Sequence, residues 1–202
     1  MPTNFLIMTK NNHIINSLNS LSSACKELSK DKIFLEKYSL LLGHLIKTIK
    51  NDNTIFICGN GGSFADAQHL VTELVVRFTH NRKALKALAL GSNQSNITAI
   101  GNDMSFDNIF LRELEAFYKK GDTVLMLSTS GNSNNLIQVA EFLKTRDKLG
   151  FSIIGKDGGL LKGSTEAIHL PYKKTALIQE LHITIGHSLC GEIENEFFGH
   201  LV

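Results

Sequence analysis

The sequence is poor in cysteine and proline, and its charges nearly cancel. Its three cysteines stand far apart and form no C-x-x-C pair, so we expect neither a disulfide framework nor an all-cysteine zinc site. Only two prolines occur in 202 residues, so little interrupts the helical patterns. The 21 basic and 19 acidic residues leave a net charge of +2, which gives no electrostatic case for a nucleic-acid partner.

Long apolar runs are also absent from the sequence. No run approaches the roughly 18 residues that a membrane-spanning helix needs. The N-terminal stretch "NFLIM" is far too short for the core of a signal peptide. We therefore expect a soluble, cytoplasmic protein with no membrane partner. Its length and its hydrophobic content of 43% suit one domain with a sizeable core.

Two helices are predicted within residues 11–50. The stretches "HIINSLNSLSSACKEL" and "KIFLEKYSLLLGHLIKTIK" repeat apolar residues at three- and four-residue steps. The polar stretch "SKDK" separates them.

From residue 54 onward, short apolar runs alternate with helical patterns. The predicted strands cover 54–58, 84–90, 123–128, 150–155 and 167–170. The predicted helices cover 63–78, 107–119, 134–148 and 174–197, with a short turn near 94–100. Alternation of this kind predicts an α/β fold in which helices cover both faces of a parallel sheet.

Two loops of this predicted sheet are suited to hold a phosphate. "GNGGS" follows the first strand, "STSGNSNN" follows the third, and each opens a helix. Glycines let backbone amides approach an anion, and a helix N-terminus offers free N–H groups. The alternative is a pair of tight turns with helix caps, in which Ser63 is an N-cap and Asp66 its capping-box partner. Two such loops favour phosphate binding, and since neither completes a nucleotide-binding motif, they suit one phosphate on a small molecule.

Ionisable side chains recur along two of the predicted helices. His69, Glu73 and Arg77 are four residues apart and are expected to share one helix face. The alternative is a solvated stripe of ion pairs. In "IQELHITIGHSL", Gln179 and His187 lie about 12 Å apart along a helix axis, so their spacing by itself shows no metal site.

Five motifs together resemble those of the phosphoheptose isomerases, which belong to the sugar isomerase (SIS) domain family. In order, they are "CGNGGSFADAQHLVTEL", "AIGNDMSFDNIF", "LSTSGNSNNLI", "GKDGG" and "IQELHITIGHSL". The resemblance covers roughly residues 15–197. "STSGNS" alone would indicate only a SIS domain, whereas the H-x-x-x-E after "GNGGS" and the final motif narrow the resemblance to this group.

The resemblance implies a flavodoxin-like three-layer sandwich with a five-stranded parallel sheet. Residues 1–50 would be an N-terminal helical segment used for oligomerisation, residues 51–202 the SIS domain, and the whole a single structural domain. The implied assembly is a homotetramer with active sites between subunits and one zinc ion per subunit.

The implied reaction converts sedoheptulose 7-phosphate to D-glycero-D-manno-heptose 7-phosphate through an enediol. It would be the first step of heptose supply for lipopolysaccharide or other surface glycans. Such an isomerisation needs a base, an acid and a group that stabilises an oxyanion.

Site residues are carried over by motif. The implied substrate-binding residues are Asn60, Gly61, Gly62, Ser63, Glu73, Asn102, Asp103, Ser128, Thr129, Ser130, Ser133 and Gln179. The implied zinc ligands are His69, Glu73, Gln179 and His187. Glu73 and His187 are also the implied catalytic groups for proton transfer. Because a glutamine oxygen is an unusual zinc ligand, Gln179 is the weakest member of that set.

The sequence departs from the family pattern at two places, and two alternative functions remain compatible with a SIS domain. Phe64 and Ala65 stand where relatives can carry polar residues, and "TAL" precedes Gln179 where relatives often place an acidic residue. One alternative is a non-catalytic SIS protein that binds a replication initiator, which would have no chemical need for the four implied ligands. The other is a sugar-phosphate-sensing regulator, disfavoured because no helix-turn-helix segment or basic arm precedes the SIS region.

Overall fold

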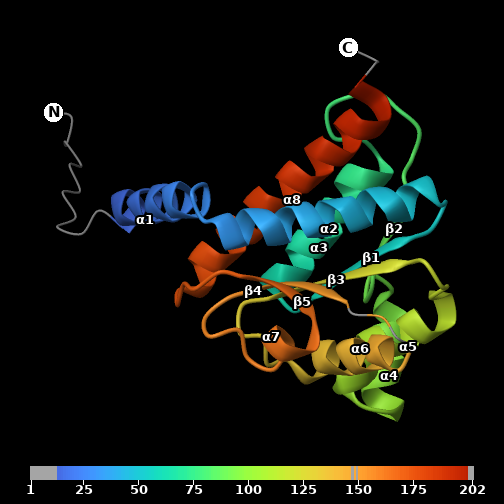
Figure 1. Cartoon of the computed structure of the whole chain (residues 1–202). Helices are drawn as coiled ribbons and strands as arrows, with labels where there is room; N and C mark the ends of the chain where they lie inside the picture. Colours follow the sequence, from blue (N-terminus) through green and yellow to red (C-terminus); the bar gives the residue numbers. More distant parts are fainter. Residues whose placement is uncertain (1–12, 147, 149, 200–202) are drawn as a thin grey trace, which may run out of the picture.

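The computed structural model describes residues 13–146, 148 and 150–199, and its centre is a five-stranded sheet (Figure 1). The strands are β1 (Ile55–Gly59), β2 (Ala87–Ala89), β3 (Thr123–Ser128), β4 (Phe151–Ile154) and β5 (Glu166–His169). They lie in the order β2-β1-β3-β4-β5, and every neighbouring pair is parallel. The predicted α/β class and five-stranded parallel sheet are confirmed.

Helices cover both faces of the sheet. Those in the described residues are α1 (His13–Leu28), α2 (Lys32–Lys50), α3 (Gly62–Val75), α4 (Gln94–Asp103), the 3-10 turn η1 (Phe106–Asn108), α5 (Ile109–Phe117), α6 (Asn134–Lys144), α7 (Leu161–Ser164) and α8 (Thr175–Phe198). Figure 1 shows α2, α3 and α8 on one face and α4 to α7 on the other. The result is a three-layer arrangement.

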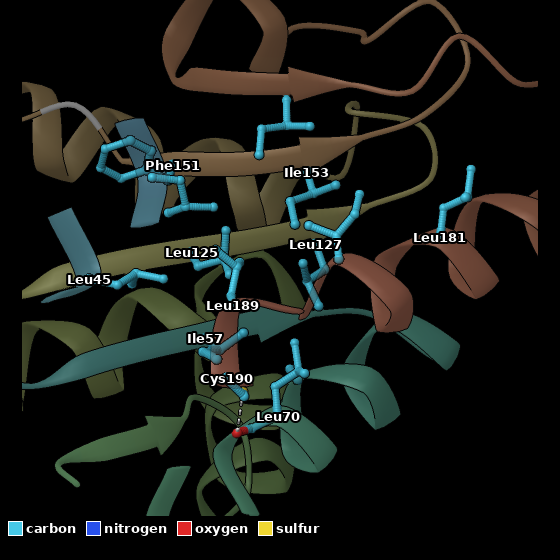
Figure 2. Close-up of a cluster of buried hydrophobic side chains, with 14 of the residues drawn as sticks. Leu45, Ile57, Leu70, Leu125, Leu127, Phe151, Ile153, Leu181, Leu189 and Cys190 are labelled. Carbon is cyan, nitrogen blue, oxygen red and sulfur yellow. Dashed lines mark hydrogen bonds between the residues drawn. The ribbon is translucent and has the colours of Figure 1, made fainter. Parts of the chain in front are cut away.

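Each face of the sheet has its own hydrophobic core. Along β1, Ile55 and Ile57 pack under α2, α3 and α8, while Phe56 and Cys58 point to the opposite face. This is the two-residue alternation of a strand. Figure 2 shows the first of these cores, with Leu70 of α3 close to the sheet. Because β1, β3 and β4 are buried on both faces, their sequences are continuous apolar runs.

The two N-terminal helices differ in how they contact the body. The Asp31 side chain caps α2, and Leu41 and Leu45 of that helix are buried in the core. In contrast, α1 extends away from the sheet (Figure 1), and its Leu18 is 58% exposed. The proposed division at residues 50 and 51 stays a prediction.

Several predicted bounds are wrong. The helix predicted over 63–78 ends at Val75, and its N-cap is Gly61, so Ser63 lies inside the first turn and does not form a capping box with Asp66. The turn predicted near 94–100 is the ten-residue helix α4. The short helix α7 has no counterpart in the prediction. The predicted strand over 84–90 shrinks to the three residues of β2, which lies at an edge of the sheet.

Candidate active site

The two predicted phosphate loops meet at the carboxyl edge of the sheet. Strand β1 lies between β2 and β3, so the strand order reverses beside it, and ligands of open α/β sheets bind at such a point. The amide of Asn60, which follows β1, donates to Asn135 on α6, and the Asn135 amide donates back to Asn60; both bonds are 2.9 Å. These paired amides hold the two loops side by side.

The loop after β3 is held by its own backbone. The Ser128 hydroxyl accepts a hydrogen bond from the Gly131 amide at 2.9 Å, and the Ser130 hydroxyl accepts one from Asn132 at 3.2 Å. Gly131 has φ +68°, and a β-carbon there would come 1.9 Å from the Gly158 carbonyl oxygen. The "GKDGG" motif therefore packs directly on this loop. Since the serine oxygens accept these bonds, their O–H groups stay available to donate to a ligand.

The other loop hydroxyls have different surroundings. Ser133 is the N-cap residue of α6, yet its side chain makes no cap hydrogen bond, so its hydroxyl is available as well. Thr129 is partly buried. Ser63 is buried in the first turn of α3, with 3% of its surface exposed. An apolar hollow of about 370 Å³ adjoins the first loop and is lined in part by Gly61 and Phe64, so Phe64 does shape this neighbourhood.

The ionisable residues converge where α3 crosses α8. His69 Nε2 lies 3.1 Å from Glu73 Oε1 and 2.9 Å from His187 Nε2. One potential ligand atom from each of the three residues lies within 4.8 Å of the others. We call His69, Glu73 and His187 the His/Glu cluster.

A glycine makes this convergence possible. A β-carbon at Gly186 would come 2.4 Å from the Leu70 side chain, so only glycine lets α8 approach α3 so closely. Leu70 and Gly186 are the chain neighbours of His69 and His187. The close crossing therefore places the two imidazoles together, although 118 residues separate them in the sequence.

The His/Glu cluster fits a divalent cation such as zinc. Two imidazoles and a carboxylate are ordinary zinc ligands, and a site with three protein ligands leaves a position open. Tetrahedral bonds of about 2.0–2.1 Å separate ligand atoms by about 3.3 Å. The distances of 2.9 and 3.1 Å differ from this by only a few tenths of an ångström. The His69 side chain is 49% exposed, so the cluster is open on one side.

Gln179 lies at the other end of the α3–α8 contact. A β-carbon at Gly62 would come 2.3 Å from its Nε2, so the carboxamide lies against the opening turn of α3. Gly62 and His69 are seven residues apart, about 10 Å along the helix. The structure therefore places the Gln179 carboxamide beside the first phosphate loop, and its role as a zinc ligand stays a prediction.

Three other predicted residues lie apart from these groups. Asn102 and Asp103 are exposed at the end of α4, and Asn102 donates to the Asp103 carboxylate at 2.7 Å. Arg77 lies beyond the end of α3 and is exposed, so the prediction that it shares a helix face with His69 and Glu73 is wrong.

A buried histidine and a partly buried aspartate, which the sequence did not reveal as a pair, lie between the loops and the His/Glu cluster. His182 is fully buried, and its Nδ1 lies 3.9 Å from Asp66 Oδ2. Neither ring nitrogen has a hydrogen-bond partner among the described residues. Burial lowers the pKa of His182 to about 4, and burial raises the pKa of Asp66 despite nearby His69. The imidazole is therefore neutral at pH 7.

Comparison with known proteins decides the family. The SIS domain family matches residues 16–155. A phosphoheptose isomerase from Clostridium acetobutylicum is 40% identical over 192 residues, which are 95% of this chain and 98% of the relative. The chain belongs to the phosphoheptose isomerases of the SIS domain family. The resemblance predicted from the motifs is confirmed, and the protein is a sugar-phosphate isomerase.

Other phosphoheptose isomerases agree. One from a Nitratiruptor species is 46% identical over 75% of this chain and 82% of its own length. The solved phosphoheptose isomerase of Francisella tularensis superposes with a TM-score of 0.86 at 28% identity, over 93% of this chain and 100% of that one. The Neisseria gonorrhoeae structure gives 0.82 at 33% identity, over 91% and 97%. Among the described residues, no helix is both long and apolar enough to cross a membrane.

Proposed function

We propose that this phosphoheptose isomerase converts sedoheptulose 7-phosphate to D-glycero-D-manno-heptose 7-phosphate in the cytoplasm. The reaction would supply heptose for lipopolysaccharide or other surface glycans. One observation carries the proposal: the His/Glu cluster includes two residues of α3, the helix that begins at the first hydroxyl-rich loop, and the Asn60–Asn135 pair ties that loop to the second. The names of the relatives support the substrate.

The two loops would hold the phosphate. Both α3 and α6 begin at these loops, so their N-termini present free amides and a positive dipole end. The proposed donors are Asn60, Gly61, Gly62, Ser63, Ser128, Thr129, Ser130 and Ser133. Hydroxyl and amide donors suit a phosphate dianion without placing a buried cation beside it.

Glu73 and His187 would transfer the protons. The isomerisation moves one proton from carbon 1 to carbon 2 and one from the hydroxyl on carbon 1 to the oxygen on carbon 2. These transfers need two groups that can accept and return a proton at adjacent positions. The Glu73 carboxylate and the His187 imidazole lie close enough within the cluster to serve one small substrate.

His69, Glu73 and His187 would hold one zinc ion per subunit. A zinc ion bound there would polarise the substrate carbonyl. Gln179 is the proposed fourth ligand and also a proposed substrate contact. Its position against Gly62 supports the substrate contact more directly, because Gly62 belongs to the first phosphate loop.

A homotetramer with active sites between subunits would explain two features of the single chain. Asn102 and Asp103, the proposed partners of sugar hydroxyls, lie on α4 and are exposed. The exposed apolar residues Ile14 and Leu18 of α1 have no cover from the described part of the chain. Beside α1, an apolar hollow of about 230 Å³ is lined by residues of α1, α2 and α8. We infer that a second copy of the chain covers this face.

Turnover of sedoheptulose 7-phosphate by the wild type and by Glu73→Gln tests the proposal. We expect at least a roughly 100-fold loss of rate in the variant, the effect of removing a general acid–base group. Glu192→Gln, an exposed substitution on α8, is the matched control and should keep the wild-type rate. Equal rates in all three proteins would remove Glu73 from the chemistry. An inactive wild type would contradict the substrate assignment.

A further inference from the structure

A second network of buried groups lies just beyond the His/Glu cluster, where α3 ends. The Glu194 carboxylate of α8 accepts hydrogen bonds from the backbone amides of Phe78, Thr79 and His80, at 3.1, 2.6 and 2.9 Å. Its side chain is 2% exposed. Burial alone would raise the pKa of this carboxyl, but the three amides and Arg82 outweigh burial and hold the pKa below its usual value. A charged, buried carboxylate thus anchors the loop that follows α3.

Arg82 completes this network and holds the end of α3. Its Nε donates to Glu194 Oε1 at 2.9 Å, and its side chain is 1% exposed. Its two terminal nitrogens donate to the backbone carbonyls of Glu73 and Leu74, each at 2.8 Å. A cation at the last carbonyls of a helix is favoured by the helix dipole. Arg82 therefore fixes the main chain of Glu73, a member of the His/Glu cluster.

Phe78 connects the same loop to His187. The rings of Phe78 and His187 have centroids 5.7 Å apart, and the His69 ring lies 4.9 Å from the His187 ring. A β-carbon at Gly191 would come 3.3 Å from the Phe78 ring, so Phe78 lies close to the surface of α8. His187, Gly191 and Glu194 follow one another at four- and three-residue steps, which places them on one stripe of the helix.

We propose that Glu194 and Arg82 form a positioning clamp for the His/Glu cluster. Glu194 anchors the loop so that Phe78 stays against the His187 imidazole, and Arg82 fixes the last turn of α3, which carries Glu73. The clamp acts through these neighbours and takes no part in the chemistry. It rests on the proposed function in one respect, the use of the cluster as a metal and proton-transfer site.

A clamp and a merely structural ion pair predict different effects. A structural pair would change only the stability of the fold. A clamp sets the distance and orientation of metal-binding side chains, and loss of such outer contacts weakens metal affinity about 10- to 100-fold. Because the phosphate loops lie at the opposite end of α3, KM should change little while kcat falls.

Zinc affinity, measured by competition with a chromophoric chelator, is the first readout, and kcat and KM are the second. Phe78→Leu, which keeps both members of the ion pair, should bind zinc at least about 10-fold more weakly than the wild type. Phe78→Tyr keeps the ring and should restore affinity to within about threefold. Glu194→Gln should resemble Phe78→Leu. Glu196→Gln is the matched control, since Glu196 lies two residues later on α8 in an exposed pair with Lys50.

The outcomes separate this proposal from the proposed function. Wild-type zinc affinity and kcat in a folded Phe78→Leu protein would overturn the clamp, and so would equal losses in the leucine and tyrosine variants. If Glu194→Gln fails to fold, as shown by circular dichroism, the Phe78→Leu and Phe78→Tyr variants test the clamp instead. Zinc competition needs no substrate, so an inactive wild type with the expected series of affinities contradicts only the proposed substrate. A wild type that binds no zinc would overturn the clamp as a metal-positioning device.

Discussion

Asn60 and Asn135 exchange two hydrogen bonds of 2.9 Å through their side-chain amides, across the gap between the loops that follow β1 and β3. Asn135 is 2% exposed, so water does not readily replace a lost bond there. The pair ties together two segments that each supply proposed phosphate donors. The pair therefore adds a side-chain tie between loops that the pairing of β1 with β3 already brings side by side.

Asn135→Ala should weaken substrate binding. Removing one partner leaves the partly buried Asn60 amide without these hydrogen bonds, at a cost near the lower end of the about 1–3 kcal/mol that a fully buried group would lose. We expect KM for the sugar phosphate to rise about 5- to 10-fold, with a smaller change in kcat. Asn134→Ala, an exposed neighbour on α6, is the matched control for steady-state kinetics. An unchanged KM in Asn135→Ala would show that the loops keep their spacing without this contact.

His69→Ala should lose the metal. His69 lies in contact with both other members of the His/Glu cluster, so its loss leaves only two members of the cluster to hold the metal. We expect the purified variant to retain less than about a tenth of the wild-type zinc after dialysis. Mass spectrometry of metal content makes the measurement, and His13→Ala, on the exposed start of α1, is the control. Full zinc content in His69→Ala would contradict the ligand assignment.

Acid should destabilise the fold through His182. Burial lowers its pKa to about 4. In the unfolded chain the ring takes up a proton near pH 6.5. Between these values the unfolded state binds more protons than the folded state, so the free energy of unfolding falls as the pH drops from about 6.5 to about 4. Above about pH 6.5 the ring is neutral in both states and this loss of stability is absent.

The His182→Leu variant measures this effect. Between pH 7.5 and pH 5 the wild type should lose about 2 kcal/mol more unfolding free energy than the variant. Urea unfolding in the presence of a chelator makes the comparison independent of bound metal. Asp66, 3.9 Å from the ring, is present in both proteins, so the difference reports the imidazole. Parallel pH profiles would show that His182 titrates normally in the folded protein.

A charge on the exposed face of α1 should break the proposed homotetramer. Leu18 is 58% exposed in the single chain, and burial of a carboxylate against a partner would be strongly unfavourable. Leu18→Glu should therefore elute as smaller species than the wild type in size-exclusion chromatography with light scattering. Asn19→Glu, the exposed neighbour on the same helix, should keep the wild-type mass. An intact tetramer in Leu18→Glu would refute the role of this face.

The sequence predicted the layers of the fold better than the ends of its elements. Strands β1 and β3 could be found because burial on both faces leaves continuous apolar runs. The end of α3 could not be found, because the groups that stop the helix, Arg82 and Glu194, come from later in the chain and from α8. Local sequence patterns do not predict contacts between residues that are distant in the sequence.

The candidate site was predictable in its residue types but not in its geometry. Motifs named His69, Glu73 and His187, while only the structure brings them within one ion's reach. The same structure places Gln179 beside the first phosphate loop and adds the Asp66–His182 pair. No spacing rule along one helix predicts contacts between two helices, since these depend on where the helices cross.

The absence of a side chain at Gly186 limits how this enzyme can vary. Even a single methyl group there would meet Leu70 and widen the gap between α3 and α8. A random library at this position, selected for activity, should return glycine almost alone, while a paired library with a smaller residue at position 70 should recover alanine. Positions 70 and 186, which are far apart in the sequence, can therefore change only together.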